Sequence, residues 1–290
     1  MATACTHGID PGFVDLGTTK VALLGALQGM TEMLPISATA HMRIVPTVLG
    51  WPDPGAAFAA AMQLAAAVAI TVFYGRDVVR LGRGTIEAAR SGDYRSFEFR
   101  TAVGLMIASL PLLIGWLVFG RRFDLCATPS REMWVIGAAS RGVAVMLAFA
   151  QLVRGHRRDF EQLRLRDAVA LGLAQCFALI PGVSRSGAAL TGALLVDLKP
   201  AEAVRWAFLA GLPAAFGIGL RGVAELRRAG LDSHGWSLVG TGFVAATLAA
   251  VLGLWILNRV MARLAVWPFV AYRTVFGAFL LLVVWLDVLA

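Results

Sequence analysis

Six long apolar stretches constrain the fold of this chain more than any other feature of its sequence. Each is roughly 20 residues long, enough for a helix to cross the hydrocarbon core of a bilayer. Only 15% of the residues are charged, whereas a soluble domain has about 25%. We therefore predict an all-α polytopic membrane protein that forms a single membrane domain over residues 1–290. The stretches are 55–75, 101–120, 132–153, 201–226, 236–257 and 267–289.

The formal net charge of +8 is explained by the positions of the arginines, many of which lie between the apolar stretches. Six of them fall in residues 76–100 and five in residues 154–166, which are loops between apolar stretches. Two predicted spans separate these loops, so both can lie on one face of the membrane, which the arginine bias makes cytoplasmic. The loop 121–131 carries three arginines on the opposite side, so the positive-inside rule, by which cytoplasmic loops carry an excess of Lys and Arg, is obeyed only loosely. This distribution indicates a membrane partner and excludes nucleic acid as the reason for the charge.

Two further apolar regions are interrupted and do not fit as simple spans. Residues 21–42 contain Glu32 and Pro35, and residues 167–198 contain Pro181. Proline removes a helix hydrogen bond and clashes with the preceding turn. Broken backbone at membrane depth is tolerated where protein buries it or where it lines a wet cavity. We therefore predict that each region is a re-entrant hairpin whose two short helices meet at a polar loop.

The two interrupted regions also resemble each other. Leu-Gly-Ala-Leu-Gln at 24–28 matches Leu-Gly-Leu-Ala-Gln at 171–175, an offset of 147 residues. Each half of the chain, about 16–153 and 167–290, then contains one re-entrant helical hairpin and three transmembrane helices. Because three is odd, the second half enters the membrane upside down, which predicts an inverted-topology repeat. Chance similarity between Gly/Ala/Leu-rich helices is the alternative for so short a match.

The first interruption gathers polar side chains at 28–41. Gln28 and Glu32 are four residues apart and share one helix face. The Glu32 carboxylate suits a divalent cation, acid–base chemistry or pairing with a buried arginine. His41 follows the break, where we expect its imidazole to return towards Glu32 and to transfer protons near neutral pH. Ser37 and Thr39 add hydroxyl groups for a substrate. A purely structural pair of Glu32 and His41 is the alternative.

The second interruption, Pro-Gly-Val-Ser-Arg-Ser-Gly at 181–187, is typical of an anion site. Gly182 and Gly187 free the backbone to present N–H groups, and Ser184 and Ser186 add hydroxyl donors. Arg185 contributes a forked cation that matches phosphate oxygens, and the next helix would point its N-terminus at the same anion. The pattern is not a Walker A motif. We predict that both polar regions form one site for an anionic group such as phosphate.

Two polar residues inside apolar stretches are compatible with two roles each. Gln63 suits a hydrogen bond to a hairpin loop as well as it suits helix–helix packing. Arg141 suits a cavity-facing position as well as it suits pairing with a carbonyl or carboxylate group.

These motifs resemble those of the undecaprenyl-diphosphate phosphatases of the bacitracin-resistance type. The similarity lies in Gln-Gly-x-Thr-Glu-x-x-Pro-Ile-Ser-x-x-Ala-His at 28–41 and Gln-x-x-Ala-x-Ile-Pro-Gly-x-Ser-Arg-Ser-Gly at 175–187. It extends over nearly the whole chain and includes Pro-Phe-x-x-Tyr-Arg at 268–273 before the final span.

The resemblance implies an enzyme of the bacterial inner membrane that removes one phosphate from undecaprenyl diphosphate and so recycles the lipid carrier of cell-wall synthesis. It also implies a divalent cation (Mg²⁺ or Ca²⁺) and a homodimer. Position by position, the resemblance assigns binding of the metal and the diphosphate to Glu32 and Gln28. It assigns acid–base catalysis to His41 and phosphate binding to Arg185.

The chain departs from the family pattern at Ala38, where a second serine is usual, and at Ala189, where a threonine is usual. Three consequences of Ala38 remain open. Water can attack with help from His41, or Ser37 or Thr39 can replace the missing hydroxyl. Alternatively, the chain binds or translocates polyprenyl phosphates with little hydrolysis. We expect hydrolysis, because the metal, acid–base and arginine positions remain together. An ion-coupled carrier of small solutes is disfavoured by the arginine-serine-glycine cradle.

Overall fold

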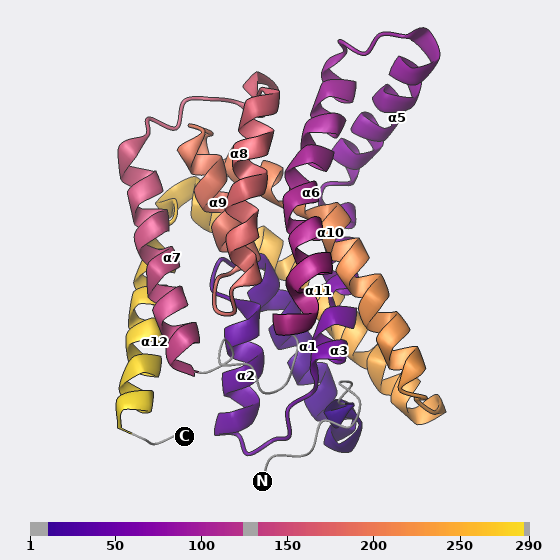
Figure 1. The fold of residues 1–290 in the computed structure, drawn as a ribbon, viewed down its shortest axis with the longest axis vertical. Helices are drawn as coiled ribbons and strands as arrows, with labels where there is room; N and C mark the ends of the chain where they lie inside the picture. Colours follow the sequence, from indigo (N-terminus) through magenta and orange to yellow (C-terminus); the bar gives the residue numbers. More distant parts are fainter. Residues whose placement is uncertain (1–10, 124–132, 287–290) are drawn as a thin grey trace.

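The chain folds into a bundle of helices, seen here in a computed structural model (Figure 1). The structure describes residues 11–123 and 133–286, and no β-strand occurs within them. The helices are η1 (Gly12–Leu16), α1 (Gly17–Met33), α2 (Ala38–Val48), α3 (Ala56–Ala61), α4 (Gln63–Phe73), α5 (Gly75–Ser91), α6 (Phe97–Phe123), α7 (Met133–Val153), η3 (Phe160–Gln162), α8 (Leu165–Cys176), η4 (Phe177–Leu179), α9 (Arg185–Leu195), α10 (Pro200–Arg228), α11 (Ser233–Leu264) and α12 (Trp267–Trp285).

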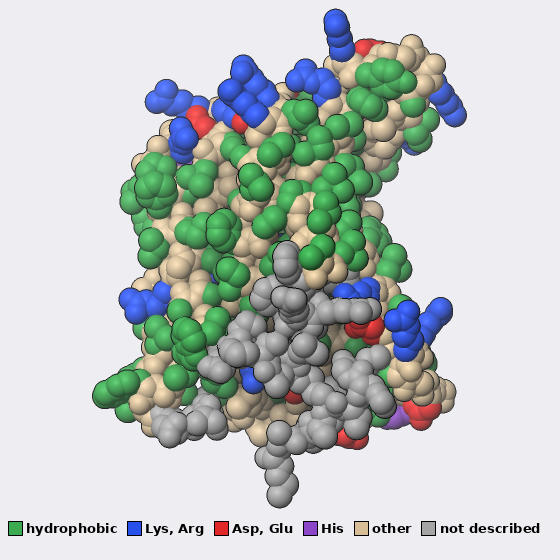
Figure 2. Space-filling model, in the orientation of Figure 1, with side chains coloured by type: hydrophobic (Ala, Val, Ile, Leu, Met, Phe, Trp, Pro, Cys, Tyr) green, Lys and Arg blue, Asp and Glu red, His purple; other side chains and the backbone are tan. Residues whose placement is uncertain are grey.

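Among the described residues, six helical segments are long and apolar enough to cross a membrane, in agreement with the sequence. The first is interrupted at Met62, where α3 ends and α4 begins. Residue 132 and residues 287–289 of the predicted spans lie outside the described part of the chain. Figure 2 shows a broad hydrophobic surface, with one group of Lys and Arg side chains along the top of the view and another in its lower part. The chain is therefore a multi-pass membrane protein. The segments are Ala56–Phe73, Phe97–Gly115, Met133–Val153, Pro200–Arg228, Ser233–Leu264 and Trp267–Trp285.

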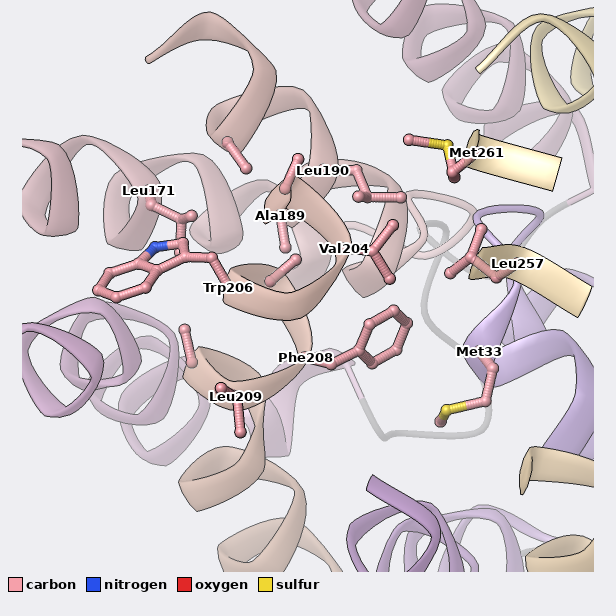
Figure 3. Packing of buried hydrophobic residues seen from close by; sticks show 14 of the residues in the cluster. Met33, Leu171, Ala189, Leu190, Val204, Trp206, Phe208, Leu209, Leu257 and Met261 are labelled. Carbon is pink, nitrogen blue, oxygen red and sulfur yellow. The ribbon is translucent and has the colours of Figure 1, made fainter. Parts of the chain in front are cut away.

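The apolar core surrounds α10, which lies among helices from both halves of the chain. Figure 3 shows Trp206, Phe208 and Leu209 of α10 among side chains of α1, α8, α9 and α11. Phe208 is 3% exposed and Met33, at the end of α1, is fully buried. This packing fixes the end of α1 against α10 and α11, just before the first break in the chain.

Helices α1 and α11 approach closely enough for their backbones to touch. A Cβ atom added at Gly25 would overlap the carbonyl of Gly242, and one added at Gly29 would overlap the carbonyl of Ala246. Helix α8 crosses α6 in a similar way, since a Cβ atom at Gly172 would lie 3.0 Å from the Ala108 oxygen. Small residues at helix crossings allow this approach in membrane proteins.

The two interrupted regions are broken where the sequence predicts. Helix α1 continues through Glu32 and ends at Met33, and α2 begins at Ala38 after the turn that contains Pro35. In the second region α8 ends at Cys176, η4 continues to Leu179, and α9 begins at Arg185. In Figure 1 the α1–α2 pair occupies the lower half of the view and the α8–α9 pair the upper half. The two breaks meet between them.

Replacing Gly29 with Ala should destabilise the fold, because the new methyl group would overlap the backbone of α11. The expected loss is about 1–3 kcal/mol in the free energy of unfolding, which is typical of overpacking. Gly240→Ala is the matched control, because a Cβ atom there meets nothing within 4 Å. Alanine favours a helix by up to about 1 kcal/mol over glycine. Thermal unfolding in detergent measures the stability of both variants. Equal melting temperatures for the two would contradict the close backbone contact between α1 and α11.

Candidate active site

The carboxylate of Glu32 lies where three separate parts of the chain meet. Glu32 is 8% exposed. Its Oε2 atom accepts hydrogen bonds from Nε2 of Gln28 (3.3 Å) and from Nε2 of Gln63 (2.9 Å). Its Oε1 atom accepts from Nε (3.2 Å) and Nη2 (3.0 Å) of Arg185, which forms an ion pair. Gln63 begins α4 and Arg185 begins α9, so α1, α4 and α9 converge on one anionic group.

Arg185 is held by a second helix as well. Its Nη1 atom donates to the carbonyl of Gly211 in α10 (2.8 Å). A Cβ atom at Gly211 would lie 2.9 Å from Nη1, so glycine leaves the room that the guanidinium needs. The planar fork of arginine gives it a fixed orientation when several of its donors are engaged. Arg185 is therefore fixed between the carboxylate of α1 and the backbone of α10.

The first break is shaped by Ser37. This residue has a φ of +75°, in the left-handed region that residues with a side chain rarely adopt. Its Oγ atom accepts from the backbone N–H of Ala40 (3.4 Å) and caps α2. One residue before Pro35, the carbonyl of Leu34 accepts from Oγ of Ser186 (3.1 Å). The hydroxyl of the second break therefore contacts the backbone of the first.

The second break packs against α7 and caps α9. Gly182 has a φ of +91°, and a Cβ atom there would lie 2.8 Å from the backbone of Ile136. Glycine is therefore required by both the backbone conformation and the space. Ser184 accepts from the N–H of Gly187 (3.2 Å), and its hydroxyl lies 2.9 Å from that of Ser186. These contacts place the start of α9 beside the first break.

Arg273 of α12 ties the two breaks together. It is fully buried. Its Nη1 atom donates to the carbonyl of Pro35 (3.0 Å) and its Nη2 atom to the carbonyl of Gly182 (2.9 Å). Its Nε atom donates to the carbonyl of Ser140 in α7 (3.1 Å). Sequence reasoning noted Arg273 only as part of a family-like stretch. The available signal was a single charged residue early in the last apolar stretch, where charge is costly.

His41 makes a different contact from the one predicted. Its Nδ1 atom lies 2.7 Å from the carbonyl of Ser37, and its Nε2 atom lies 2.6 Å from the hydroxyl of Tyr272. A carbonyl only accepts, so we assign the ring proton to Nδ1, and Nε2 accepts from Tyr272. The ring also stacks on Phe276 at a centroid distance of 4.8 Å. Both ring nitrogens are thus engaged, and the predicted direct pair with Glu32 does not form.

The cause of this correction is local geometry. His41 is four residues after Ser37, so the helical turn of α2 brings its ring back to the Ser37 carbonyl. Tyr272 lies beside Arg273 on α12, and sequence reasoning gave it no role. It is 40% exposed, so it connects the buried imidazole to the surface of the molecule.

The remaining candidates differ in their placement. Thr39 is exposed, unlike Ser37 and His41, and no contact joins it to the cluster in the part of the chain described. Of the two roles left open for Gln63, the structure supports the hydrogen bond to a hairpin, because it donates to Glu32. Arg141 is exposed on α7, where its side chain lies against Gly277 of α12.

The two departures from the family pattern lie in different surroundings. Ala38 is the first residue of α2 and is 8% exposed, directly after the strained Ser37. Ala189 is 1% exposed and belongs to the apolar core cluster. The change at Ala38 therefore removes a hydroxyl beside the site, whereas the change at Ala189 affects packing.

Comparisons with known proteins agree with the motifs. The family model described as "Bacitracin resistance protein BacA" matches residues 21–279. "Undecaprenyl-diphosphatase 2" of Mesorhizobium japonicum is 46% identical over 256 residues, which cover 88% of this chain and 97% of that protein. "Undecaprenyl-diphosphatase" of Synechococcus sp. (strain JA-3-3Ab) is 40% identical over 265 residues, 91% of this chain and 93% of that protein. Its namesake in Synechococcus elongatus is 39% identical over 263 residues, 90% and 91% of the two chains.

Replacing Arg273 with Lys should destabilise the protein even though the charge is kept. A single ammonium group cannot reach three carbonyls on three segments, and each buried acceptor left unpaired costs about 1–3 kcal/mol. We expect a loss of at least about 2 kcal/mol in the free energy of unfolding. The matched control is Arg263→Lys at an exposed position of α11. Thermal unfolding in detergent measures the difference, and an Arg273→Lys protein as stable as its control would refute the tie between the two breaks.

Proposed function

This chain belongs to the family of the bacitracin resistance protein BacA, and from that premise we propose that it hydrolyses undecaprenyl diphosphate to undecaprenyl phosphate and inorganic phosphate. The named relatives cover most of the chain at up to 46% identity. The product is the lipid carrier that cell-wall synthesis reuses. We place the protein in the bacterial inner membrane, where this substrate is found, with the lipid as its partner.

One observation carries this proposal: the acidic group of the first break contacts the arginine of the second. The Glu32–Arg185 pair is 3.0 Å long, and Arg273 connects the backbones of both breaks. Arg185, Arg273 and Glu32 together give the region of the two breaks a net positive charge. A cluster of that sign within apolar surroundings suits an anionic headgroup at membrane depth.

The diphosphate would bind at the start of α9. The guanidinium of Arg185 would turn from Glu32 to the phosphate oxygens, which it matches through paired N–H groups. Ser184 and Ser186 offer hydroxyl groups, and Gly182 and Gly187 keep the backbone close. The N-terminus of α9 adds its partial positive charge.

The family also implies a divalent cation, and the donors around Glu32 fit one of the hard, oxygen-binding type. Gln28 and Gln63 add amide groups beside the carboxylate, and Oε1 of Gln63 is buried without a hydrogen-bond partner. Within the described residues no group of three or more His, Cys, Asp or Glu side chains occurs. Protein ligands alone are therefore few, and Mg²⁺ typically takes its remaining oxygens from substrate phosphates. Bound there, the cation neutralises charge on the diphosphate.

His41 has the geometry of a base. Its Nδ1–H group is directed to the carbonyl of Ser37, which leaves Nε2 as the accepting nitrogen. When the hydroxyl group of Tyr272 moves away from Nε2, a water molecule can take its place and give Nε2 a proton. Tyr272 acts on the reaction through His41 by holding the ring, so we regard it as a positioning residue.

Water is the favoured nucleophile. A serine nucleophile needs its hydroxyl within reach of the base, but the Oγ atom of Ser37 caps α2, and His41 contacts the Ser37 carbonyl instead of its hydroxyl. In the proposed step the water oxygen attacks the terminal phosphorus and its proton passes to Nε2. The bond from that phosphorus to the bridging oxygen breaks, and the lipid monophosphate leaves. Arg185 stabilises the charge on the transferring group.

We further propose that the single membrane domain is an inverted repeat of two halves, each with a re-entrant hairpin. Three features support this proposal. Gly25 and Gly172 occupy the same place in the repeated pentapeptide, and each packs its helix against a long helix of the other half, α11 and α6 respectively. The last helices of the halves, α7 and α12, pack together. The α1–α2 and α8–α9 pairs approach the centre from opposite ends (Figure 1).

Loss of any of three groups should abolish phosphate release from undecaprenyl diphosphate. Glu32→Gln, His41→Ala and Arg185→Lys should each lower kcat/KM by about 100-fold or more, as expected when a charge-stabilising or proton-transferring group is removed. Chelation of divalent cations with EDTA should have a similar effect. The measurement is release of inorganic phosphate by the purified protein in detergent.

Arg228→Lys, at the far end of α10, is the control for a change of one basic residue and should keep wild-type activity. Full activity in Glu32→Gln or His41→Ala would remove the roles assigned to these residues. A wild-type protein that binds the lipid and releases no phosphate would favour the translocating alternative.

Ala38→Ser tests the choice of nucleophile. If water attacks with help from His41, the added hydroxyl should change kcat less than about threefold, because one more weak hydrogen bond has little effect on the barrier. The control is Ala189→Ser, which adds a hydroxyl within the apolar core and should lower stability instead. An increase of about tenfold or more in kcat for Ala38→Ser would mean that a serine at this position supplies a better route.

A further inference from the structure

An apolar groove of about 270 Å³ lies between α7 and α9, against the 181–187 turn. Its described lining is almost entirely hydrocarbon and glycine. Thr191 adds a hydroxyl, which donates to the carbonyl of Gly187 (2.8 Å) and so offers no free polar group. The residues that define its walls are Ala138, Gly142, Val143, Ile180, Val183 and Thr191.

The 181–187 turn separates this groove from the polar cluster. On one side of the turn the carbonyl of Gly182 accepts from Arg273, and Ser186 donates to the first break. On the other side Ile180 and Val183 line the groove. Arg185, which we expect to bind the diphosphate, is only two residues from Val183. The wall of the groove is therefore also the wall of the phosphate site.

Next to Glu32 and Gly211 the polar cluster has no room for a hydrocarbon chain. Met33, Phe208 and Leu209 pack there with exposed fractions of 0–3% (Figure 3). A lipid with its headgroup at Arg185 must lead its chain away from this packed core, and the groove beside α9 is an open apolar path that adjoins the turn.

We propose that this groove holds the part of the substrate's prenyl chain that is nearest to the diphosphate. The inference rests on the proposed function and adds a second, apolar subsite to it. The occupant must combine a diphosphate at Arg185 with a hydrocarbon chain in the groove, and a prenyl diphosphate has both. A bilayer phospholipid offers the same hydrocarbon without the matching headgroup, so it would enter the groove without preference for the substrate.

Gly142→Leu tests the groove by filling it. A Cβ atom at Gly142 meets nothing within 4 Å, so the new side chain can extend into the groove with the helix intact. Gly240→Leu is the matched control, because its position on α11 is equally open and exposed. The measurement is KM for undecaprenyl diphosphate and for methyl diphosphate, which keeps the esterified diphosphate but has no prenyl chain to occupy the groove.

For Gly142→Leu the ratio of the KM value for undecaprenyl diphosphate to that for methyl diphosphate should rise about tenfold, as expected when a few methylene groups lose their burial. The ratio should stay at its wild-type value in the control. An unchanged ratio in Gly142→Leu would overturn the proposal. Ala138→Leu, on the same wall, is the second variant and should act in the same direction.

A labelling experiment on the wild-type protein separates this inference from the proposed function. A prenyl diphosphate with a photoreactive diazirine on the isoprene unit next to the diphosphate should label residues 134–146 and 177–191, as mapped by mass spectrometry. Unlabelled undecaprenyl phosphate should compete. Labelling elsewhere, or none in these two peptides, would overturn the binding of the prenyl chain in the groove even if phosphate is released. Labelling in these peptides with no phosphate release would instead refute hydrolysis and keep the groove.

Discussion

Two helix breaks inside an apolar bundle expose backbone carbonyls that need donors, and Arg273 supplies them. A helix satisfies its own backbone, which is why unbroken helices dominate membrane proteins. At Pro35 and Gly182 the carbonyls have no helical N–H partner, and the guanidinium of Arg273 donates a hydrogen bond to each of them instead. The positions of Ser37, Arg185 and Ser186 follow from the two turns that Arg273 fixes. The hydrogen bonds that Arg273 makes to the backbone therefore fix the two turns, and the turns in turn fix the positions of the reactive side chains.

The ion pair between Glu32 and Arg185 depends on this framework. A buried pair is costly to desolvate, and removing one partner leaves the other uncompensated. Here each partner has additional hydrogen bonds: two amides contact Glu32, and the carbonyl of Gly211 contacts Arg185. Without substrate, the two groups neutralise each other. A ligand that enters must offer Arg185 more negative charge and more hydrogen-bond acceptors than one carboxylate does, and a diphosphate offers both.

Much of this arrangement could be predicted from the sequence. Six spans follow from apolar length, and the two breaks follow from proline and polar residues in apolar surroundings. Pairing with a buried arginine was one of three roles that the sequence left open for Glu32, and Arg185 is the arginine that the structure places there. The roles of Arg273 and Tyr272 could not be predicted, because a pattern along one helix does not reveal which distant carbonyls or rings it meets. The partner of His41 was wrong because its own helical turn offers a nearer acceptor than Glu32.

The crossing of α1 and α11 at Gly25 and Gly29 also limits how the molecule can move. Where two backbones touch, no layer of side chains separates them that could change rotamer and let one helix slide past the other. In this chain the helix that carries Glu32 is locked onto a helix from the other half. We therefore expect α1 and α11 to move as one rigid body in any rearrangement of the bundle.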